Sequence, residues 1–153
     1  MTAADESGEH DSDSHVHVAF DRLIPSDVRE IEPIVEQVTQ ECLVLALPPR
    51  QCALNVPVAL TEALSNAILR GNRGARNKHV RVRAVISDSA LVLEVADEGS
   101  GFDLEACTLD PTSPGNLERE DGRGLFLMRA LMDRVERYEA NARNVVRLTL
   151  NRT

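Results

Sequence analysis

The order of hydrophobic patterns along the chain constrains its fold more than any other feature. An alternation typical of a half-buried strand comes first, and two stretches of helical periodicity follow. Two apolar runs separated by four turn-forming residues then predict a β-hairpin, and an apolar helix and two more strands end the chain. The predicted elements are a strand at 15–20, helices at 27–45 and 51–70, strands at 80–86 and 91–96, a helix at 124–133, and strands at 134–139 and 144–150. This order predicts an α/β two-layer sandwich, with helices on one face of a mixed, mainly antiparallel sheet.

The composition predicts one domain and one polar arm. In a chain of 153 residues, 42% hydrophobic residues suffice for a single core. Residues 1–15 carry five acidic side chains, no Lys or Arg, and little apolar content, so we expect a disordered acidic arm followed by a domain at 16–153. Three histidines in or near this arm, His10, His15 and His17, could bind a metal, but a solvated tail or strand edge is the more typical role.

The cysteines, charge and hydropathy limit the function classes. Cys42, Cys52 and Cys107 are odd in number and form no CxxC pair, which favours structural thiols in a reducing compartment. The sequence shows neither an apolar run of membrane-spanning length nor a basic amino terminus, so a cytoplasmic location without membrane contact is predicted. The net charge of −8 disfavours nucleic-acid binding.

Three separated blocks carry residue types suited to nucleotide chemistry. In ALTEALSNAILRGN, Glu62 and Asn66 stand four apart and so share one side of a helix, as Arg70 and Arg73 are expected to do. A carboxylate can deprotonate a nucleophile, and an amide oxygen suits magnesium. Taken alone, this pattern is also that of a solvated polar face.

The second and third blocks are glycine turns beside a strand and a helix. In VADEGSGFD a strand delivers Asp97, whose carboxylate can accept a hydrogen bond from an exocyclic amino group; a simple turn uses the same residues. In EDGRGLFLMRALMD, Gly122 and Gly124 are expected to precede a helix whose free amides suit phosphate oxygens. The irregular stretch between the two blocks is longer than a compact domain usually keeps without a function.

Together these blocks resemble the nucleotide site of the GHKL ATPase superfamily, which has the Bergerat fold. The phrases SNAILRGN, DEGSGFD and DGRGLFLMRALMD are most similar to its stand-alone branch of anti-sigma factor serine kinases. The resemblance implies ATP and Mg²⁺ as ligands, Glu62 as the catalytic base, Asn66 as the magnesium ligand and Asp97 as the adenine contact. It implies an ATP lid at 104–121. The further nucleotide-binding positions that it implies are Arg70, Gly99, Gly101, Gly122, Arg123, Gly124, Leu125 and Asn144.

The chain departs from that branch at two places. Arg70 stands where the branch commonly has a histidine, and an arginine there could pair with a phosphate or with a partner's carboxylate. Arg143 and Asn144 stand where it often has Gly-Thr near the adenine, so Asn144 is expected to substitute as a polar contact. Both departures bear on the geometry of the substrate and on the kinase rate.

Basic side chains cluster between the first block and the hairpin. Alternate exposure along a strand explains such a pattern, and a docking patch for an acidic partner is the competing hypothesis. The cluster consists of Arg70, Arg73, Arg76, Lys78, His79, Arg81 and Arg83.

The resemblance implies a function in transcriptional partner switching. It predicts an ATP-dependent protein serine kinase that phosphorylates an anti-anti-sigma (STAS) protein and sequesters a sigma factor, acting as a homodimer. An ATP-binding partner-switching module with weak catalysis is the alternative. The catalytic domain of a histidine kinase is less favoured, because no helical hairpin with a phosphoacceptor histidine precedes the domain, and a gyrase- or MutL-type engine would need a transducer domain.

Overall fold

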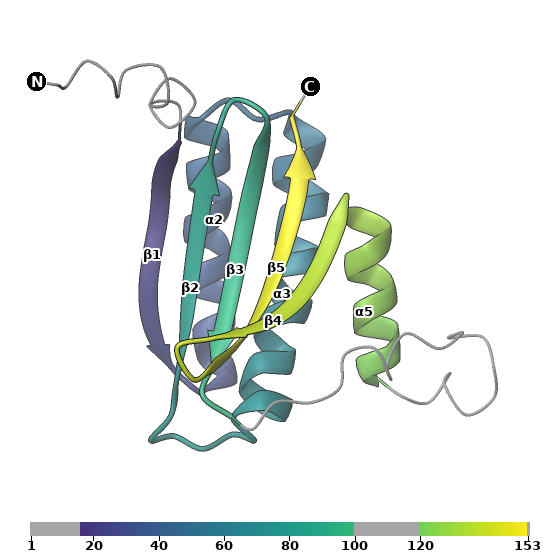
Figure 1. Ribbon diagram of the computed structural model, residues 1–153. Helices are drawn as coiled ribbons and strands as arrows, with labels where there is room; N and C mark the ends of the chain where they lie inside the picture. The colour runs from purple at the N-terminus through teal and green to yellow at the C-terminus, as the bar shows by residue number, and fades with distance from the viewer. Residues whose placement is uncertain (1–15, 100–119, 153) are drawn as a thin grey trace, which may run out of the picture.

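One antiparallel sheet forms the front layer of the molecule, and the helices cover its rear face (Figure 1). The computed structural model describes residues 16–99 and 120–152. The sheet order is β1-β2-β3-β5-β4, and every pairing in the described ranges is antiparallel, where the sequence had allowed a mixed sheet. The strands are β1 (His17–Pro25), β2 (His79–Ile86), β3 (Ala90–Asp97), β4 (Arg134–Ala140) and β5 (Arg143–Asn151). The predicted two-layer α/β sandwich is confirmed.

In the described residues, the helical layer contains three α-helices and several tighter or wider turns. The helices are α2 (Ile31–Val44), α3 (Val56–Asn66) and α5 (Glu120–Leu131); a 3-10 turn η1 (Val28–Glu30) precedes α2, and π-helical turns η2 (Gln51–Asn55) and η3 (Ala67–Gly71) flank α3. Asp27 caps η1 by accepting a hydrogen bond from the Arg29 backbone amide at 2.9 Å, as its position before a helix predicts. Pro33 lies in the first turn of α2, where proline is tolerated.

The core lies between the rear face of the sheet and these helices. Alternate residues of β2 are buried, as the period of a strand with one covered face requires. We call the continuous helical stretch 51–71, which contains η2, α3 and η3, the central helix; its Leu60, Leu64 and Ile68 are at most 1% exposed. The unbroken helical stretch 51–71 is long and apolar enough to span a membrane, contrary to the expectation from the sequence, but half of it is buried inside this fold, as in a core helix.

The strand β1 is longer than predicted. Its polar–apolar alternation is interrupted by a register shift between Val18 and Phe20, after which Phe20 and Ile24 face the core. Pairing with β2 continues to Pro25. Proline is accepted there because β1 is an edge strand and needs no donor on its open side.

The two described cysteines are buried free thiols. Cys42 and Cys52 are each 1% exposed, and burial raises the pKa of the Cys42 thiol to about 12. A thiol of this kind is unreactive at neutral pH, since the thiolate is the nucleophile. Their role in the core agrees with the structural role predicted; Cys107 lies outside the described residues.

Candidate functional site

The central helix brings Glu62 and Asn66 against the first turns of α5. Asn66 is only 8% exposed, so it does not sit on a solvated face. A β-carbon placed at Gly124 would lie 2.7 Å from Glu62 Oε1 and 3.7 Å from Asn66 Nδ2. Glycine therefore allows the backbone of α5 to approach both polar groups. We call Glu62, Asn66 and Gly124 the α3–α5 cluster.

A second group of polar residues lies where the same helical stretch ends. Asp97, the last residue of β3, is 3% exposed and accepts hydrogen bonds at Oδ1 from the Gly99 amide at 2.9 Å and from Asn144 Nδ2 at 3.2 Å. A side chain at Gly71 would overlap the Asp97 carboxylate, and one at Gly99 would overlap the Gly71 carbonyl. We call Gly71, Asp97, Gly99 and Asn144 the Asp97 cluster.

The pKa of the Asp97 carboxyl group is subject to opposing effects. Burial raises its pKa above the ordinary value and outweighs the hydrogen bonds from Asn144 and Gly99 and the positive charges of Arg137 and Lys78, which act to lower it. A buried carboxyl held in this way at the end of a strand is typical of a functional group, because a merely structural position gains nothing from the cost of burial.

The π-helical turn η3 sets the spacing between the two clusters. The Asn72 amide donates to the Ala67 carbonyl at 2.8 Å, five residues back, so the helix is wider here than an α-helix. The 3.6-residue period predicted that Glu62, Asn66, Arg70 and Arg73 share one polar side of the helix. In the structure Asn66 and Gly71 are buried, whereas Arg70 and Arg73 are exposed. Insertions of this kind are frequent at functional sites.

Asn72 ties the end of this helix to residues at or next to the ends of three strands. Its Nδ2 donates to Ser26 Oγ at 2.6 Å and to the His79 carbonyl at 3.0 Å, and its Oδ1 accepts from the Glu98 amide at 2.7 Å. Asn72 is 1% exposed, so these bonds are shielded from water. The position of Gly71 beside Asp97 is thus held by its neighbour in sequence.

The other predicted site residues fall in different surroundings. The helix α5 begins at Glu120, so Gly122 and Gly124 lie inside its first turns and do not precede it as predicted. Arg123 is exposed, whereas the Leu125 side chain is 1% exposed in the core, which leaves only its backbone for a ligand. Gly101 and nearly all of the predicted lid at 104–121 lie outside the described residues.

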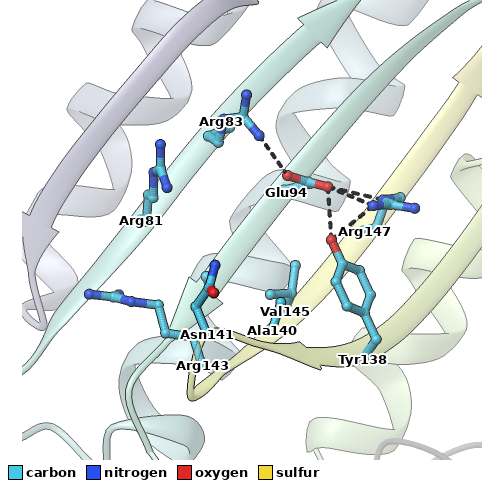
Figure 2. A pocket seen from close by; sticks show the side chains of 10 residues that line it. Arg81, Arg83, Glu94, Tyr138, Ala140, Asn141, Arg143, Val145 and Arg147 are labelled. Carbon is cyan, nitrogen blue, oxygen red and sulfur yellow. Dashed lines mark hydrogen bonds and ion pairs between the residues drawn. The ribbon is translucent and has the colours of Figure 1, made fainter.

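The open face of the sheet holds an arginine-lined hollow of about 280 Å³ (Figure 2). Arg81 makes a bidentate contact with Asp21, through Nε to Oδ1 at 3.0 Å and through Nη2 to Oδ2 at 2.8 Å. Arg83 Nη1 lies 3.3 Å from Glu94 Oε1. Glu94 also accepts from Arg147 Nε and from the Tyr138 hydroxyl, each at 3.0 Å. The sheet's own carboxylates therefore partner these arginines, which favours strand alternation as the origin of the basic pattern.

Comparison with known proteins identifies the family. A family profile described as histidine kinase-like ATPase domain matches residues 24–150. The chain therefore belongs to the histidine kinase-like ATPase domain family, which confirms the GHKL resemblance of the three blocks.

The curated relatives narrow the family to its anti-sigma branch. The chain is 30% identical over 97 residues to serine-protein kinase RsbW of Listeria monocytogenes serovar 1/2a, covering 60% of this chain and 62% of the relative. It is 38% identical over 86 residues to the anti-sigma F factor of Clostridium acetobutylicum (54% and 57% covered), and 31% identical over 121 residues to that of Clostridium beijerinckii (77% and 73% covered). It thus spans about three-fifths of the length of the first two relatives.

Three residues in or beside the two clusters were not singled out from the sequence. Gly71 and Asn72 stand at the end of the first block, and a Gly-Asn pair that closes an apolar helix is a signal of close backbone approach. Arg137, which donates to Asn144 Oδ1 at 3.0 Å, lies in an ordinary polar–apolar strand, and nothing in its sequence context distinguishes it.

Proposed function

We propose that the protein is an ATP-dependent protein serine kinase and anti-sigma regulatory factor. One observation carries the proposal: a single helical stretch places Glu62 and Asn66 against a glycine of α5 and ends with Gly71 against the buried carboxylate of Asp97. The proposed metal ligand Asn66 and proton acceptor Glu62 lie on this stretch, and the proposed base contact Asp97, at the end of β3, packs against its last residue. The names of the curated relatives agree with this assignment.

The residues present fit a magnesium nucleotide. The described residues include no group of three or more His, Cys, Asp or Glu side chains that could hold a metal by themselves. Magnesium commonly takes one or two protein ligands, with phosphate oxygens and water completing its shell, and Asn66 supplies one amide oxygen beside the start of α5. When bound, the ion would neutralise the charge on the phosphates.

The remaining roles are assigned from position. We assign to Asp97 the hydrogen bond from the adenine amino group, and to the amides at the start of α5 the contact with the phosphates. Gly71 and Gly99 allow the helix end, Asp97 and the turn after β3 to pack closely together. Glu62 takes the proton from the serine hydroxyl as the phosphoryl group is transferred. Phosphoryl transfer depends chiefly on such positioning, so few groups are needed. Arg70, Gly101, Gly122, Arg123 and Leu125 complete the proposed nucleotide site.

The proposed partners come from the branch that the chain resembles. The phosphorylated serine lies on an anti-anti-sigma (STAS) protein, and the kinase, as a homodimer in the cytoplasm, sequesters a sigma factor. Phosphorylation of the STAS protein releases the kinase to hold the sigma factor. This switch needs no direct contact with nucleic acid, in agreement with the acidic net charge.

An ATP-binding switch with weak phosphoryl transfer is the second candidate. The residue at position 144 favours this second candidate, because the branch often has a small threonine there and this chain has an asparagine. Both amide hydrogens of Asn144 are donated to protein groups, Asp97 and the Gly99 carbonyl. In that case ATP stabilises a partner-binding surface and Glu62 is dispensable for partner binding.

The first experiment is calorimetric titration with ATP, with and without magnesium, of wild type and Asp97→Asn. We expect binding that needs magnesium, and a loss of about 1–3 kcal/mol in the variant, because its amide presents a donor where the base also donates. Unchanged ATP affinity in Asp97→Asn would remove Asp97 as the base contact. Wild-type protein that binds no ATP would remove the proposed function.

The second experiment separates the two candidates. Wild type and Glu62→Gln are incubated with labelled ATP and the cognate STAS protein, and phosphoserine is counted while partner binding is followed in parallel. A kinase loses phosphoserine in the variant and keeps ATP binding. Equal phosphoserine in both proteins removes Glu62 as the base, and ATP-dependent partner binding with no phosphoserine in wild type favours the switch.

A further inference from the structure

Asn144 is saturated by hydrogen bonds to protein groups. Its Nδ2 donates to Asp97 Oδ1 at 3.2 Å and to the Gly99 carbonyl at 2.7 Å, while its Oδ1 accepts from Arg137 Nη2 at 3.0 Å. Asn144 is 6% exposed. Both amide hydrogens are therefore committed, so Asn144 has none left to donate to a bound base.

Arg137 determines which way this amide points. A guanidinium group only donates and a carbonyl only accepts, so the amide oxygen must face Arg137 and the amide nitrogen must face Gly99. A reversed amide would set two donors together at Arg137 and two acceptors together at both Gly99 and Asp97. The orientation is thus a physical requirement of the three neighbours.

The same bonds orient the carboxylate of Asp97. Among the described residues, both donors to this carboxylate reach Oδ1, and Oδ2 accepts from neither of them and packs against Gly71, closer than a side chain there would allow. One oxygen is thereby held by the protein, and the other is left as the acceptor for a ligand. Within the described part of the chain, the charged groups that act on this carboxyl group are Arg137 in β4 and Lys78 in the turn before β2.

We propose that Arg137 is a positioning residue for base recognition, acting through the Asn144 amide to hold Asp97 with Oδ2 directed to the exocyclic amino group of a purine. The inference rests on the proposed function, since it names the residue that sets the base selectivity of that nucleotide site. It also revises the role of Asn144, from a contact with the base to a link between Arg137 and Asp97.

The first test compares ATP with inosine triphosphate, which has an oxygen in place of the amino group. Calorimetry of Arg137→Met should show ATP binding about tenfold weaker than in wild type, with little change for inosine triphosphate. The preference for ATP over inosine triphosphate should therefore fall about tenfold. Tripolyphosphate, which has no base, should bind both proteins equally. Arg137→Lys should recover part of the preference, because an ammonium group can donate to the same oxygen.

A double-mutant cycle tests whether Arg137 acts through Asn144. In an Asn144→Leu background, Arg137→Met should cause no further loss of ATP affinity, because the link is already broken. Arg134→Met is the matched control: it removes the same charge from the same strand at an exposed side chain that contacts Glu136 at 3.4 Å, and should leave the preference unchanged.

A measurement without nucleotide keeps the inference independent of kinase activity. Carboxyl NMR titration should show a higher pKa for Asp97 in Arg137→Met than in wild type, because a positive charge near the carboxylate is lost. Equal losses for ATP and inosine triphosphate, additive effects in the cycle, or an unchanged pKa of Asp97 would each overturn the inference. If wild type binds no ATP, the proposed function fails and the NMR titration alone decides whether Arg137 positions Asp97.

Discussion

Replacing Gly124 with alanine should make the protein more stable and less active. Gly124 lies inside α5 and its φ is not positive, so alanine is compatible with the backbone and favours a helix interior by about 1 kcal/mol. The new β-carbon would stand 2.7 Å from Glu62 Oε1, and ordinary contact begins at 3.4 Å, so the carboxylate has to retreat by about 0.7 Å. A misplacement near 1 Å can cost about a hundredfold in rate, because catalytic groups act at fixed distances.

The assay pairs thermal unfolding without nucleotide with single-turnover phosphoryl transfer to the proposed STAS partner at saturating ATP. We expect Tm to rise by about 3 °C and the transfer rate to fall by about a hundredfold. Gly74→Ala is the control: Gly74 has a φ of +70° and open space around it, so this change should lower Tm through left-handed strain and spare the transfer rate. An unchanged transfer rate in Gly124→Ala would refute the proposed contact between α5 and Glu62.

Three further predictions concern stability. Leu64→Ala, at a side chain that is 0% exposed in the central helix, should lower the free energy of unfolding in urea by about 3 kcal/mol, and a change below about 1 kcal/mol would mean that this part of the core collapses around the gap. Asn72→Ala should cost about 2 kcal/mol by leaving its buried partners unpaired, whereas the exposed neighbour Asn77→Ala should be neutral; equal effects would argue against the network. Because burial raises the pKa of Asp97 in the folded state, the contribution of this group to the free energy of unfolding is full below pH 3.8 and is lost as pH rises through the folded pKa. Without nucleotide, Asp97→Asn should therefore gain stability relative to wild type from acidic to neutral pH. A stability difference between the two proteins that does not change with pH would contradict the burial cost.

The elements with unbroken periodicity were predictable from the sequence. The hairpin of β2 and β3 was expected at 80–86 and 91–96 and is found at His79–Ile86 and Ala90–Asp97, because alternating burial leaves little freedom of register. β1 was placed with less success, since a bulge reverses its alternation midway and the pattern alone then predicts a shorter strand.

The start of α5 was placed too late for a different reason. Glycines at 122 and 124 have low helix propensity, and such residues normally indicate a turn. The structure keeps both in the helix, and at Gly124 the close approach of Glu62 and Asn66 gives the reason. Where tertiary packing requires a glycine inside a helix, it overrides the low helix propensity of glycine. A local sequence pattern does not predict such packing.

The central helix shows why the site could be predicted in part only. Glu62 and Asn66 follow the ordinary period and were identified from it, but η3 adds one residue to the turn that follows. That insertion leaves the charged Arg70 in solvent and buries Gly71, the residue whose missing side chain makes room for the Asp97 carboxylate. In a continuous α-helix, residue 70 would follow Asn66 on the same side of the helix. The side chain of Arg70 would then point toward Asp97, the proposed base contact. The π-helical turn therefore brings the α3–α5 cluster and the Asp97 cluster to the same helical stretch, as the proposed nucleotide site requires, and this change of helical phase is visible only once β3 is in place against the helix.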